Sequence, residues 1–398
     1  MNSSIWQNPK PLGLSKSFLL LRYLKSLIYN SVAELRFMRK NDITYTKAIG
    51  IILMVMCHAL NMETSFNSFV YMFHMPLFFF FSGYCLKTEY FNKPYKFVCK
   101  RLKGLYWPFV KWNMIFLMLH NTFFSLHLYS SVYGFHGVGS KIYSNSDVSY
   151  HLFQILLQMR EHELLLGGYW FLRALFVGGI IAFFMLLLVS VTSQKMRIAH
   201  LPGYVIGGAI LITTCVWINH VHYSRPNAYL ITAQDFAAAL LFYVGYGFRY
   251  FCIRKFRWYE CIIALVIVLL GSYLWPMGLA NQFYNNHKLL PYLFTAVLGS
   301  WGVYSLPWKR IARGILELLR YIGENTLSIL TWHFLTFKMV SLFIIIIYHL
   351  PIERLGEFPV IVEYAARGWC IAYFLVGMIV TCAIAYCNRW IHNSWLKL

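Results

Sequence analysis

The chain has 398 residues, of which 59% are hydrophobic and only 12% are charged, and its mean hydropathy is +0.55. A soluble domain carries about 25% charged residues to cover its surface, so this composition excludes an ordinary soluble domain and indicates lipid as the main solvent. The net charge of +21 does not require a nucleic-acid partner, because the basic residues follow a membrane topology.

Apolar stretches long enough to cross a bilayer recur along most of the chain. A transmembrane helix needs about 20 largely apolar residues to span a hydrocarbon core of ~30 Å. We therefore expect an all-α polytopic membrane protein, with one transmembrane domain at 44–390, a basic N-terminal extension at 1–43 and a cytoplasmic tail at 391–398. Hydropathy predicts ten helices, at residues 44–61, 66–86, 104–125, 167–190, 201–219, 229–250, 258–276, 289–306, 323–349 and 367–388.

The Lys and Arg residues collect on one side of these predicted helices. Twenty-five of the 35 lie in the two termini and in the connections on the same side, whereas five lie on the opposite side. Basic residues favour the cytoplasmic side, so both termini are expected in the cytoplasm. In residues 16–38 apolar positions alternate with Lys and Arg, which indicates either a helix lying on the anionic inner leaflet or a basic topology signal.

The nine cysteines and the histidines of the longest outward connection form no recognisable metal or disulfide pattern. There is no paired CxxC spacing, and we interpret the cysteines inside predicted helices as small buried apolar side chains: Cys57, Cys85, Cys215, Cys261, Cys370 and Cys382. The connection at 126–166 holds four histidines without helical metal-ligand spacing. We predict no metal site and expect this connection to cover or line a substrate entrance.

The first predicted helix carries two ionisable residues on one face. Lys47 and His58 are eleven residues apart, which returns them to the same side of a helix, with ~16 Å between them along its axis. Ionisable groups at membrane depth are costly and are usually functional. Lys47 begins at the cytoplasmic surface, so His58 is expected in the outer half of the bilayer, where a neutral imidazole can act as a base.

The second predicted helix is interrupted beside a histidine. It contains the run Phe73-His74-Met75-Pro76-Leu77-Phe78-Phe79-Phe80-Phe81-Ser82-Gly83-Tyr84. Pro76 removes a backbone donor and disturbs the preceding turn, so we expect the helix to open there. A broken helix beside an intramembrane histidine is typical of a functional site, and most of the phenylalanines are interpreted as lipid-facing or packing surface.

These two helices resemble the integral-membrane acyltransferase-3 family, whose members are mostly bacterial O-acyltransferases of cell-surface glycans. Three later stretches agree in order and position, and the resemblance covers about residues 42–390: Lys100-Arg101-Leu102-Lys103 through Pro108, Tyr169-Trp170-Phe171-Leu172, and Ile322-Gly323-Glu324-Asn325-Thr326-Leu327-Ser328 through Trp332-His333-Phe334. Lys47 stands where most of the family has Arg, as in a subgroup that resembles fucose O-acetylases. The family commonly has an acidic residue three positions before Lys47, where this chain has Thr44. Asp42, two positions further back, is expected to face away from Lys47.

The resemblance implies a membrane O-acyltransferase in a bacterial inner membrane. The donor would be cytosolic acyl-CoA, most often acetyl-CoA, and the acceptor a hydroxyl of a cell-surface or lipid-linked glycan. His58 would be the central catalytic group, either as the general base for the acceptor hydroxyl or as a transient acyl carrier. Lys47 would take part in catalysis and contact the acyl donor. Lys100, Arg101 and Lys103 would bind the CoA phosphates. The acyl chain, the acceptor and the oligomeric state stay open.

Three further polar residues at membrane depth are candidates for the acceptor site. His74 and His333 are interpreted either as groups that orient His58 or bind the sugar, or as structural histidines with satisfied hydrogen bonds. Asp235, in the sixth predicted helix, either holds an imidazole in its useful tautomer or neutralises Arg173.

Three residues around the start of the fourth predicted helix are candidates on the outer side. Glu161 and Glu163 either hydrogen-bond sugar hydroxyls or belong to a solvated loop face. Trp170 either stacks on a sugar ring or belongs to the interfacial aromatic belt.

Two other classes of protein could also have many membrane helices and polar groups within them. A secondary transporter or flippase for a lipid-linked sugar is the main alternative, although such transporters often contain internal repeats and this sequence shows none. A structural component of a polysaccharide assembly machine would not need Lys47 and His58 on one face. The sequence therefore favours acyl transfer.

Overall fold

The protein is almost entirely helical in a computed structural model, which describes residues 40–60, 64–196, 200–224, 231–251, 253–279 and 286–395. Within these residues the strands are one short antiparallel hairpin, β1 (Gly134–Phe135) and β2 (Val138–Gly139). The all-α prediction is confirmed. The interfacial helix or topology signal predicted within the N-terminal extension falls in residues 16–38, which lie outside the described residues.

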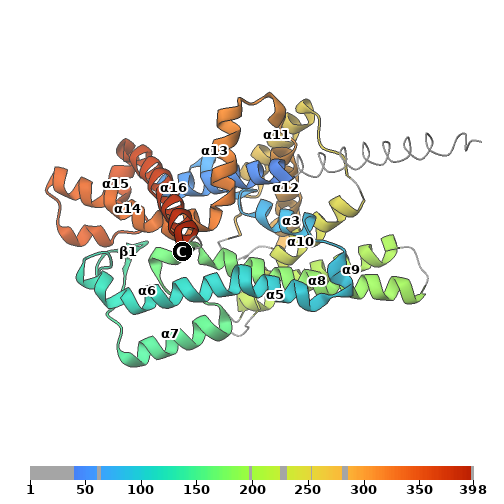
Figure 1. The fold of residues 1–398 in the computed structure, drawn as a ribbon, viewed down its shortest axis with the longest axis horizontal. Helices are drawn as coiled ribbons and strands as arrows, with labels where there is room; N and C mark the ends of the chain where they lie inside the picture. The colour runs from blue at the N-terminus through green and yellow to red at the C-terminus, as the bar shows by residue number, and fades with distance from the viewer. Residues whose placement is uncertain are drawn as a thin grey trace, which may run out of the picture.

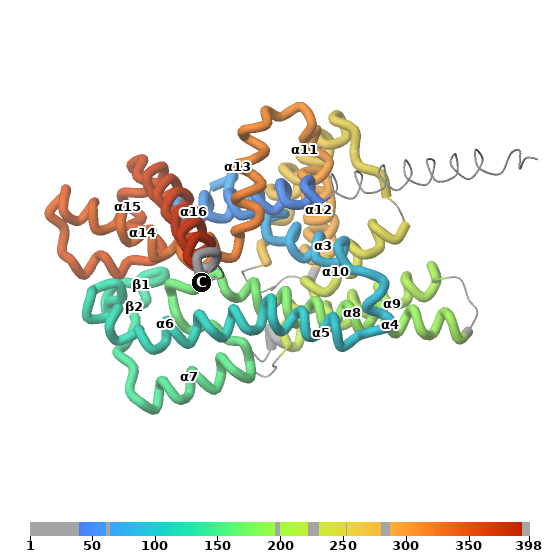
Figure 2. The backbone as a smooth tube through the Cα atoms, viewed as in Figure 1, coloured from blue at the N-terminus to red at the C-terminus, as the bar shows by residue number. Residues whose placement is uncertain are grey.

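The first half of the chain builds the helices that hold all the family motifs except the late one that begins at Ile322. The helix Lys40–Leu60 is followed by α2 (Ser65–Tyr71), α3 (Pro76–Tyr84), α4 (Glu89–Asn92) and α5 (Pro94–Arg101). A π-helical turn, η1 (Leu102–Tyr106), joins α5 to α6 (Trp107–Ser125), so one continuous rod replaces the predicted start at residue 104 (Figure 2). The hairpin and α7 (Asn145–Gln158) follow, and a 3-10 turn, η2 (Leu164–Tyr169), leads into α8 (Trp170–Met196).

The second half continues as helices with short connections. It comprises α9 (His200–Ser224), α10 (Ala233–Tyr250), α11 (Trp258–Leu274), α12 (Asn286–Tyr304), η3 (Trp308–Arg310), α13 (Arg313–Glu324), α14 (Thr326–Tyr348), η4 (Ile352–Gly356), α15 (Val362–Tyr364), η5 (Ala365–Trp369) and α16 (Cys370–Trp395). The last helix therefore continues into the segment predicted as a tail.

Six helices are long and apolar enough to cross a membrane, judged over the described residues: Lys40–Leu60, Leu164–Lys195, His200–Val221, His287–Arg310, Thr326–Tyr348 and Val362–Ile391. Each coincides with a predicted span. The other four predicted spans are also helical, as the broken pair α2 and α3 and as α6, α10 and α11. The protein is therefore an integral membrane protein with many membrane-embedded helices.

The helix α3 lies at the centre of the packing. It packs against α10 and α12, and α10 also packs against α8 and α9. Gly83 makes the contact between α3 and α10 possible, because a Cβ at this position would collide with the backbone carbonyl of Phe242. Phe78 to Phe81 are all buried, which confirms that these phenylalanines are packing residues and excludes the lipid-facing alternative.

The remaining helices are arranged around this core. Figure 1 shows α14, α15 and α16 gathered at one end of the molecule, while α6 and α7 run side by side along one edge. Gly323 lets α13 approach the first helix, since a Cβ there would collide with the carbonyl oxygen of Thr44. The late motif that begins at Ile322 is therefore held directly against the helix that carries Lys47 and His58.

Candidate active site

Two histidines from opposite ends of the chain meet inside the helical core. His58 Nδ1 on the helix Lys40–Leu60 lies 3.1 Å from Nε2 of His333 on α14, and the two rings are nearly parallel. His333 is completely buried and His58 is partly buried. The structure therefore brings together the predicted central histidine and one of its two predicted partners.

The hydrogen bonds around His333 determine which nitrogen of His58 carries a lone pair. Nδ1 of His333 lies 3.1 and 3.0 Å from the carbonyl oxygens of Ile329 and Leu330, and a carbonyl only accepts, so this nitrogen carries the hydrogen. In a neutral imidazole Nε2 is then an acceptor, and Nδ1 of His58 must donate to it. The lone pair of His58 is consequently on Nε2, where it is available to a reacting group.

Aromatic rings enclose this histidine pair. Phe334 stacks on His58 with ring centroids 4.8 Å apart, and Phe358, from the connection before α15, packs on Phe334 at 4.6 Å. Tyr169, from the Tyr-Trp-Phe-Leu motif, forms a 2.7 Å hydrogen bond with Thr331 on α14. Three of the family motifs thus give the histidine pair largely apolar surroundings.

A buried lysine, which was not among the candidates from the sequence, holds the connection that carries Phe358. Lys338 on α14 is only 3% exposed, and its ammonium donates to the carbonyl oxygens of Leu355 (2.8 Å) and Glu357 (2.5 Å). Both acceptors precede Phe358 in the chain. Lys338 therefore fixes the position of the ring that packs over Phe334, and its intramembrane charge was the signal that could have revealed it.

His74 occupies the break in the second membrane segment. Residues Met72 to Met75 separate α2 from α3, and Pro76 is the first residue of α3, as predicted. Nδ1 of His74 lies 2.9 Å from the carbonyl oxygen of Val70, which also accepts from the backbone amides of Phe73 and His74. His74 is also within electrostatic range of His58. It is part of the same polar core without joining the His58–His333 hydrogen bond.

Four cations surround the end of α3 on the predicted cytoplasmic side. Lys47, Lys100, Arg101 and Arg249 all lie within electrostatic range of the Cys85 thiol, and we call these four the cytoplasmic cation cluster. They come from the first helix, from α5 and from α10. The prediction that Lys47, Lys100 and Arg101 lie on one side of the membrane is consistent with this convergence.

The cluster is anchored by contacts with α3. Arg101 donates to Ser82 Oγ at 2.6 Å and lies over the Phe97 and Phe242 rings, while Arg249 donates to the carbonyl oxygen of Tyr84 at 3.1 Å. Lys103, on the π-helical turn, is exposed. Arg249 was counted only as a topology signal in the sequence, because nothing local links it to α3.

The interpretation of the cysteines was wrong for Cys85, which is exposed at this cluster. Cys57, Cys215 and Cys261 are buried as expected, and Cys370 and Cys382 are partly buried. Asp42 hydrogen-bonds to Lys255 at 2.6 Å, which confirms that it faces away from Lys47. Lys47 therefore has no carboxylate partner on the preceding turn, and its ammonium belongs to the cation cluster.

Asp235 pairs with Arg173, one of the two alternatives considered. Its Oδ1 accepts from Arg173 at 3.0 Å, and its Oδ2 accepts from the backbone and hydroxyl of Thr232, which caps α10. Both charged side chains are buried. A buried ion pair with additional hydrogen bonds joins α8 to α10, and a role for Asp235 in binding substrate stays a prediction.

Glu163 belongs to a buried hydrogen-bonded group on the predicted outer side. It is only 2% exposed, and its carboxylate contacts Nδ1 of His120 at 3.0 Å and accepts from the hydroxyl of Tyr129 at 2.9 Å. The alternative of a solvated loop face is therefore wrong for Glu163. Trp170, at the start of α8, is partly buried and contacts Phe171 edge to face.

Beside this group, four buried polar atoms have no hydrogen-bond partner within the part of the chain that the structure describes. They are His151 Nδ1, Gln154 Oε1, Gln158 Oε1 and His162 Nε2. The rings of His151 and His162 lie 4.1 Å apart. Such atoms are almost always paired in folded proteins, so this segment is suited to a ligand with several hydroxyl groups.

Glu161, in the same segment but outside the membrane-spanning helices, is expected to make stability depend on pH. Burial raises the pKa of Glu161 from its ordinary 4.5 to about 7, so folding takes up protons between these values and its contribution to the free energy of unfolding falls as the pH rises. Burial lowers the pKa of His162 from 6.5 to about 4, so its contribution rises over an overlapping range.

Glu161→Gln removes the Glu161 contribution to the free energy of unfolding, which falls as the pH rises, and leaves the contribution of His162 in place. The thermal midpoint of this variant in detergent should therefore increase relative to wild type as the pH is raised from about 5 to about 7.5. Glu353→Gln, at an exposed position on the predicted outer side, is the control. Parallel curves for Glu161→Gln and wild type would contradict the prediction.

Comparison with known families agrees with these motifs. Residues 40–387 match the family described as an acyltransferase domain, from the helix that carries Lys47 and His58 into α16. Neither a search of curated proteins nor a search of solved structures found a match. The family match covers most of the chain, including the histidine pair and the cation cluster. The chain therefore belongs to the acyltransferase-3 family and is a membrane-embedded acyltransferase.

Proposed function

We propose that this protein moves an acetyl group from cytosolic acetyl-CoA to a hydroxyl of a cell-surface or lipid-linked glycan, in a bacterial inner membrane. The observation that carries the proposal is the lone pair on His58 Nε2, which the hydrogen bonds of His333 leave available. The family assignment favours acyl transfer over transport of a lipid-linked sugar. The fucose O-acetylase-like subgroup, suggested by Lys47, is part of the same proposal.

The chemistry needs one proton acceptor and then one proton donor. His58 Nε2 takes the proton of the acceptor hydroxyl while the oxygen attacks the thioester carbonyl. The tetrahedral intermediate collapses, the carbon–sulfur bond breaks, and the imidazolium returns its proton to the leaving thiolate of CoA. His333 keeps Nδ1 of His58 occupied throughout and so holds the ring in the productive tautomer. We favour this route over a transient acyl-histidine because it forms no covalent intermediate on the enzyme.

The cytoplasmic cation cluster is the proposed site for the CoA phosphates. Lys47 and His58 share a helix and are separated by ~16 Å along its axis, a distance that the pantetheine arm of CoA can span. Lys47, Lys100, Arg101 and Arg249 supply the charge-assisted donors that phosphates require. Lys103, exposed on the π-helical turn, is retained as a proposed outer contact.

Lys47→Ala should raise the KM for acetyl-CoA about tenfold, because a phosphate would lose one charged hydrogen-bond donor. Lys47→Arg should keep a KM within about twofold of wild type, since Arg supplies the same charge. Initial rates at varied acetyl-CoA and fixed acceptor measure both effects. Lys309→Ala, at an exposed basic position in η3, is the matched control. An unchanged KM in Lys47→Ala would remove this residue from the donor site.

The acceptor is proposed to enter from the opposite side, beside the buried polar segment. Glu161 and the unpaired atoms of His151, Gln154, Gln158 and His162 are suited to sugar hydroxyls. From there, η2 leads to the histidine pair, because Gly168 lies against Leu330 and His333. Trp170 adds an aromatic face at the end of η2.

The other candidates predicted for this site hold the surrounding helices. Glu163 and Asp235 are proposed as positioning residues, through His120 and Arg173 respectively. His74 is proposed to line the polar core near His58.

The decisive test is acetyl-CoA turnover by the purified protein in nanodiscs. Free CoA release is measured with a panel of lipid-linked and free glycans, in parallel for wild type and His58→Ala. Acceptor-stimulated release by wild type alone supports the proposal. Absence of turnover and of acetyl-CoA binding across a broad panel would overturn it and favour another acyl donor.

A further inference from the structure

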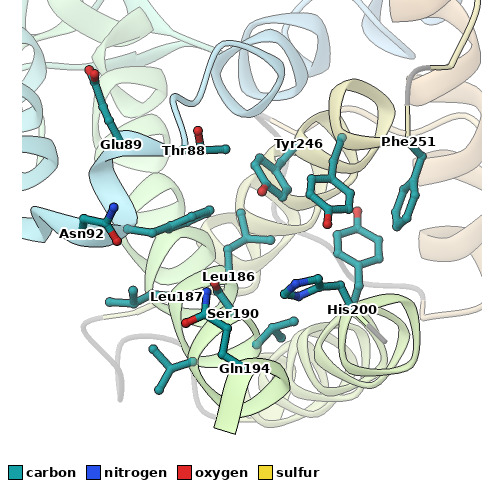
Figure 3. A pocket seen from close by; sticks show the side chains of 15 residues that line it. Thr88, Glu89, Asn92, Leu186, Leu187, Ser190, Gln194, His200, Tyr246 and Phe251 are labelled. Atoms are coloured by element: carbon teal, nitrogen blue, oxygen red, sulfur yellow. The ribbon is translucent and has the colours of Figure 1, made fainter. Parts of the chain in front are cut away.

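A cavity away from the histidine pair lies at the ends of three helices on the predicted cytoplasmic side. Its volume is about 450 Å³, within the range of small-molecule sites. α4 lies beside it, and the ends of α8 and α10 and the start of α9 complete its wall. Figure 3 shows Ser190 and Gln194 from α8, His200 from α9 and Tyr246 from α10 around the same space.

The lining combines aromatic rings with neutral polar groups. Phe91, Tyr204, Tyr246, Tyr250 and Phe251 contribute rings, of which Tyr250 and Phe251 are 45% and 39% exposed. Besides the tyrosine hydroxyls, the donors and acceptors without a formal charge are Thr88, Asn92, Ser190, Gln194 and His200. Aromatic faces stack on planar ligands, and side-chain amides and hydroxyls hydrogen-bond to the edge of a heteroaromatic base.

The charge of the lining argues against a phosphate inside the cavity. Among the lining residues that the structure describes, the only formally charged one is Glu89, which forms a 3.3 Å salt bridge with Lys87. An anion placed there would meet a carboxylate and, among the described lining residues, no Lys or Arg. The occupant that fits is therefore planar, aromatic and uncharged.

The cavity adjoins the cytoplasmic cation cluster. Phe91, in the cavity wall, stacks on Phe183, which stacks in turn on Phe97 at 4.1 Å, and Arg101 lies 4.9 Å from the centre of the Phe97 ring. Arg249 lies on α10 between the lining residues Tyr246 and Tyr250. A ligand with a planar base and adjacent phosphates could therefore contact both regions.

We propose that this cavity binds the adenine base of the acyl-CoA donor. This proposal rests on the proposed function, because it assumes that the donor is a CoA thioester. The base stacks against the tyrosines of α9 and α10, with its polar edge toward Gln194 and Ser190, while the phosphates lie at the cytoplasmic cation cluster. The pantetheine arm then extends toward His58. This arrangement gives the enzyme a means of selecting CoA thioesters over shorter thioesters that lack the nucleotide.

The test uses full-length protein in nanodiscs and two acetyl donors, acetyl-CoA and S-acetylpantetheine. Ser190→Trp fills the cavity and should raise the KM for acetyl-CoA at least tenfold, while the rate with S-acetylpantetheine stays unchanged. Ser149→Trp, on the exposed face of α7, is the matched control. Tyr250→Ala should also raise the KM for acetyl-CoA without changing the rate with S-acetylpantetheine. Tyr250→Phe, which keeps the ring, should have the wild-type KM for acetyl-CoA.

Direct binding of adenosine 3′,5′-bisphosphate, measured by calorimetry, separates the two proposals. Binding to wild type that Ser190→Trp weakens at least tenfold supports the adenine site, whether or not any acceptor in the panel is acetylated. Equal binding by both proteins, or none by wild type, overturns the adenine site. Turnover of acetyl-CoA with an unchanged KM in Ser190→Trp would also overturn it and leave the proposed function intact.

Discussion

His58→Ala is expected to reduce acyl transfer by at least about 10²- to 10⁴-fold, the usual contribution of a positioned general base. The variant should insert and fold, because His58 is partly exposed and its side-chain hydrogen bond is made to a single residue, His333. The loss should therefore appear in kcat at saturating acetyl-CoA, with little change in donor affinity. Initial rates of CoA release, with thermal unfolding measured in parallel, check both parts.

The control for this variant is a histidine away from the His58–His333 pair. His220, near the end of α9, is exposed, and His220→Ala should keep the wild-type rate. A fully active His58→Ala protein would eliminate the mechanism. If His58→Ala lost activity together with its thermal transition, His58→Gln, which keeps a hydrogen-bonding side chain of similar length, would replace it in the comparison.

His333→Ala is expected to lower kcat by about 10²-fold while leaving the KM for acetyl-CoA within about twofold of wild type. Without an acceptor at Nε2 of His333, Nδ1 of His58 is no longer held as the donor, and the imidazole can adopt the tautomer that places hydrogen on the reacting nitrogen. The effect is that of a positioning residue, since His333 acts through His58.

Two substitutions separate this role from simple packing. His333→Gln places an amide oxygen near the position of Nε2, so it should restore part of the lost rate. His333→Phe preserves the ring shape without the acceptor and should be as slow as His333→Ala. Equal activity of the Gln and Phe variants would show that packing against Phe334 and Phe337 is the whole contribution of His333.

The sequence by itself determined the features that depend on neighbouring residues. The helical spans follow from local hydropathy, and the break before α3 follows from the missing backbone donor of Pro76. Lys47 and His58 share a face because the helical repeat relates positions eleven residues apart. The ordered motifs identified the family because each retains its own local pattern.

Only the tertiary structure decided which of these helices face one another. A membrane helix that is apolar on every face does not reveal which face meets a partner, so the pairing of His58 with His333, 275 residues away, was not readable from periodicity. The same holds for Asp235 with Arg173, for Lys338 with the carbonyl oxygens of Leu355 and Glu357, and for Arg249 beside Cys85. Burial leaves polar groups in apolar surroundings with few possible partners, and the packing of distant helices selects among them.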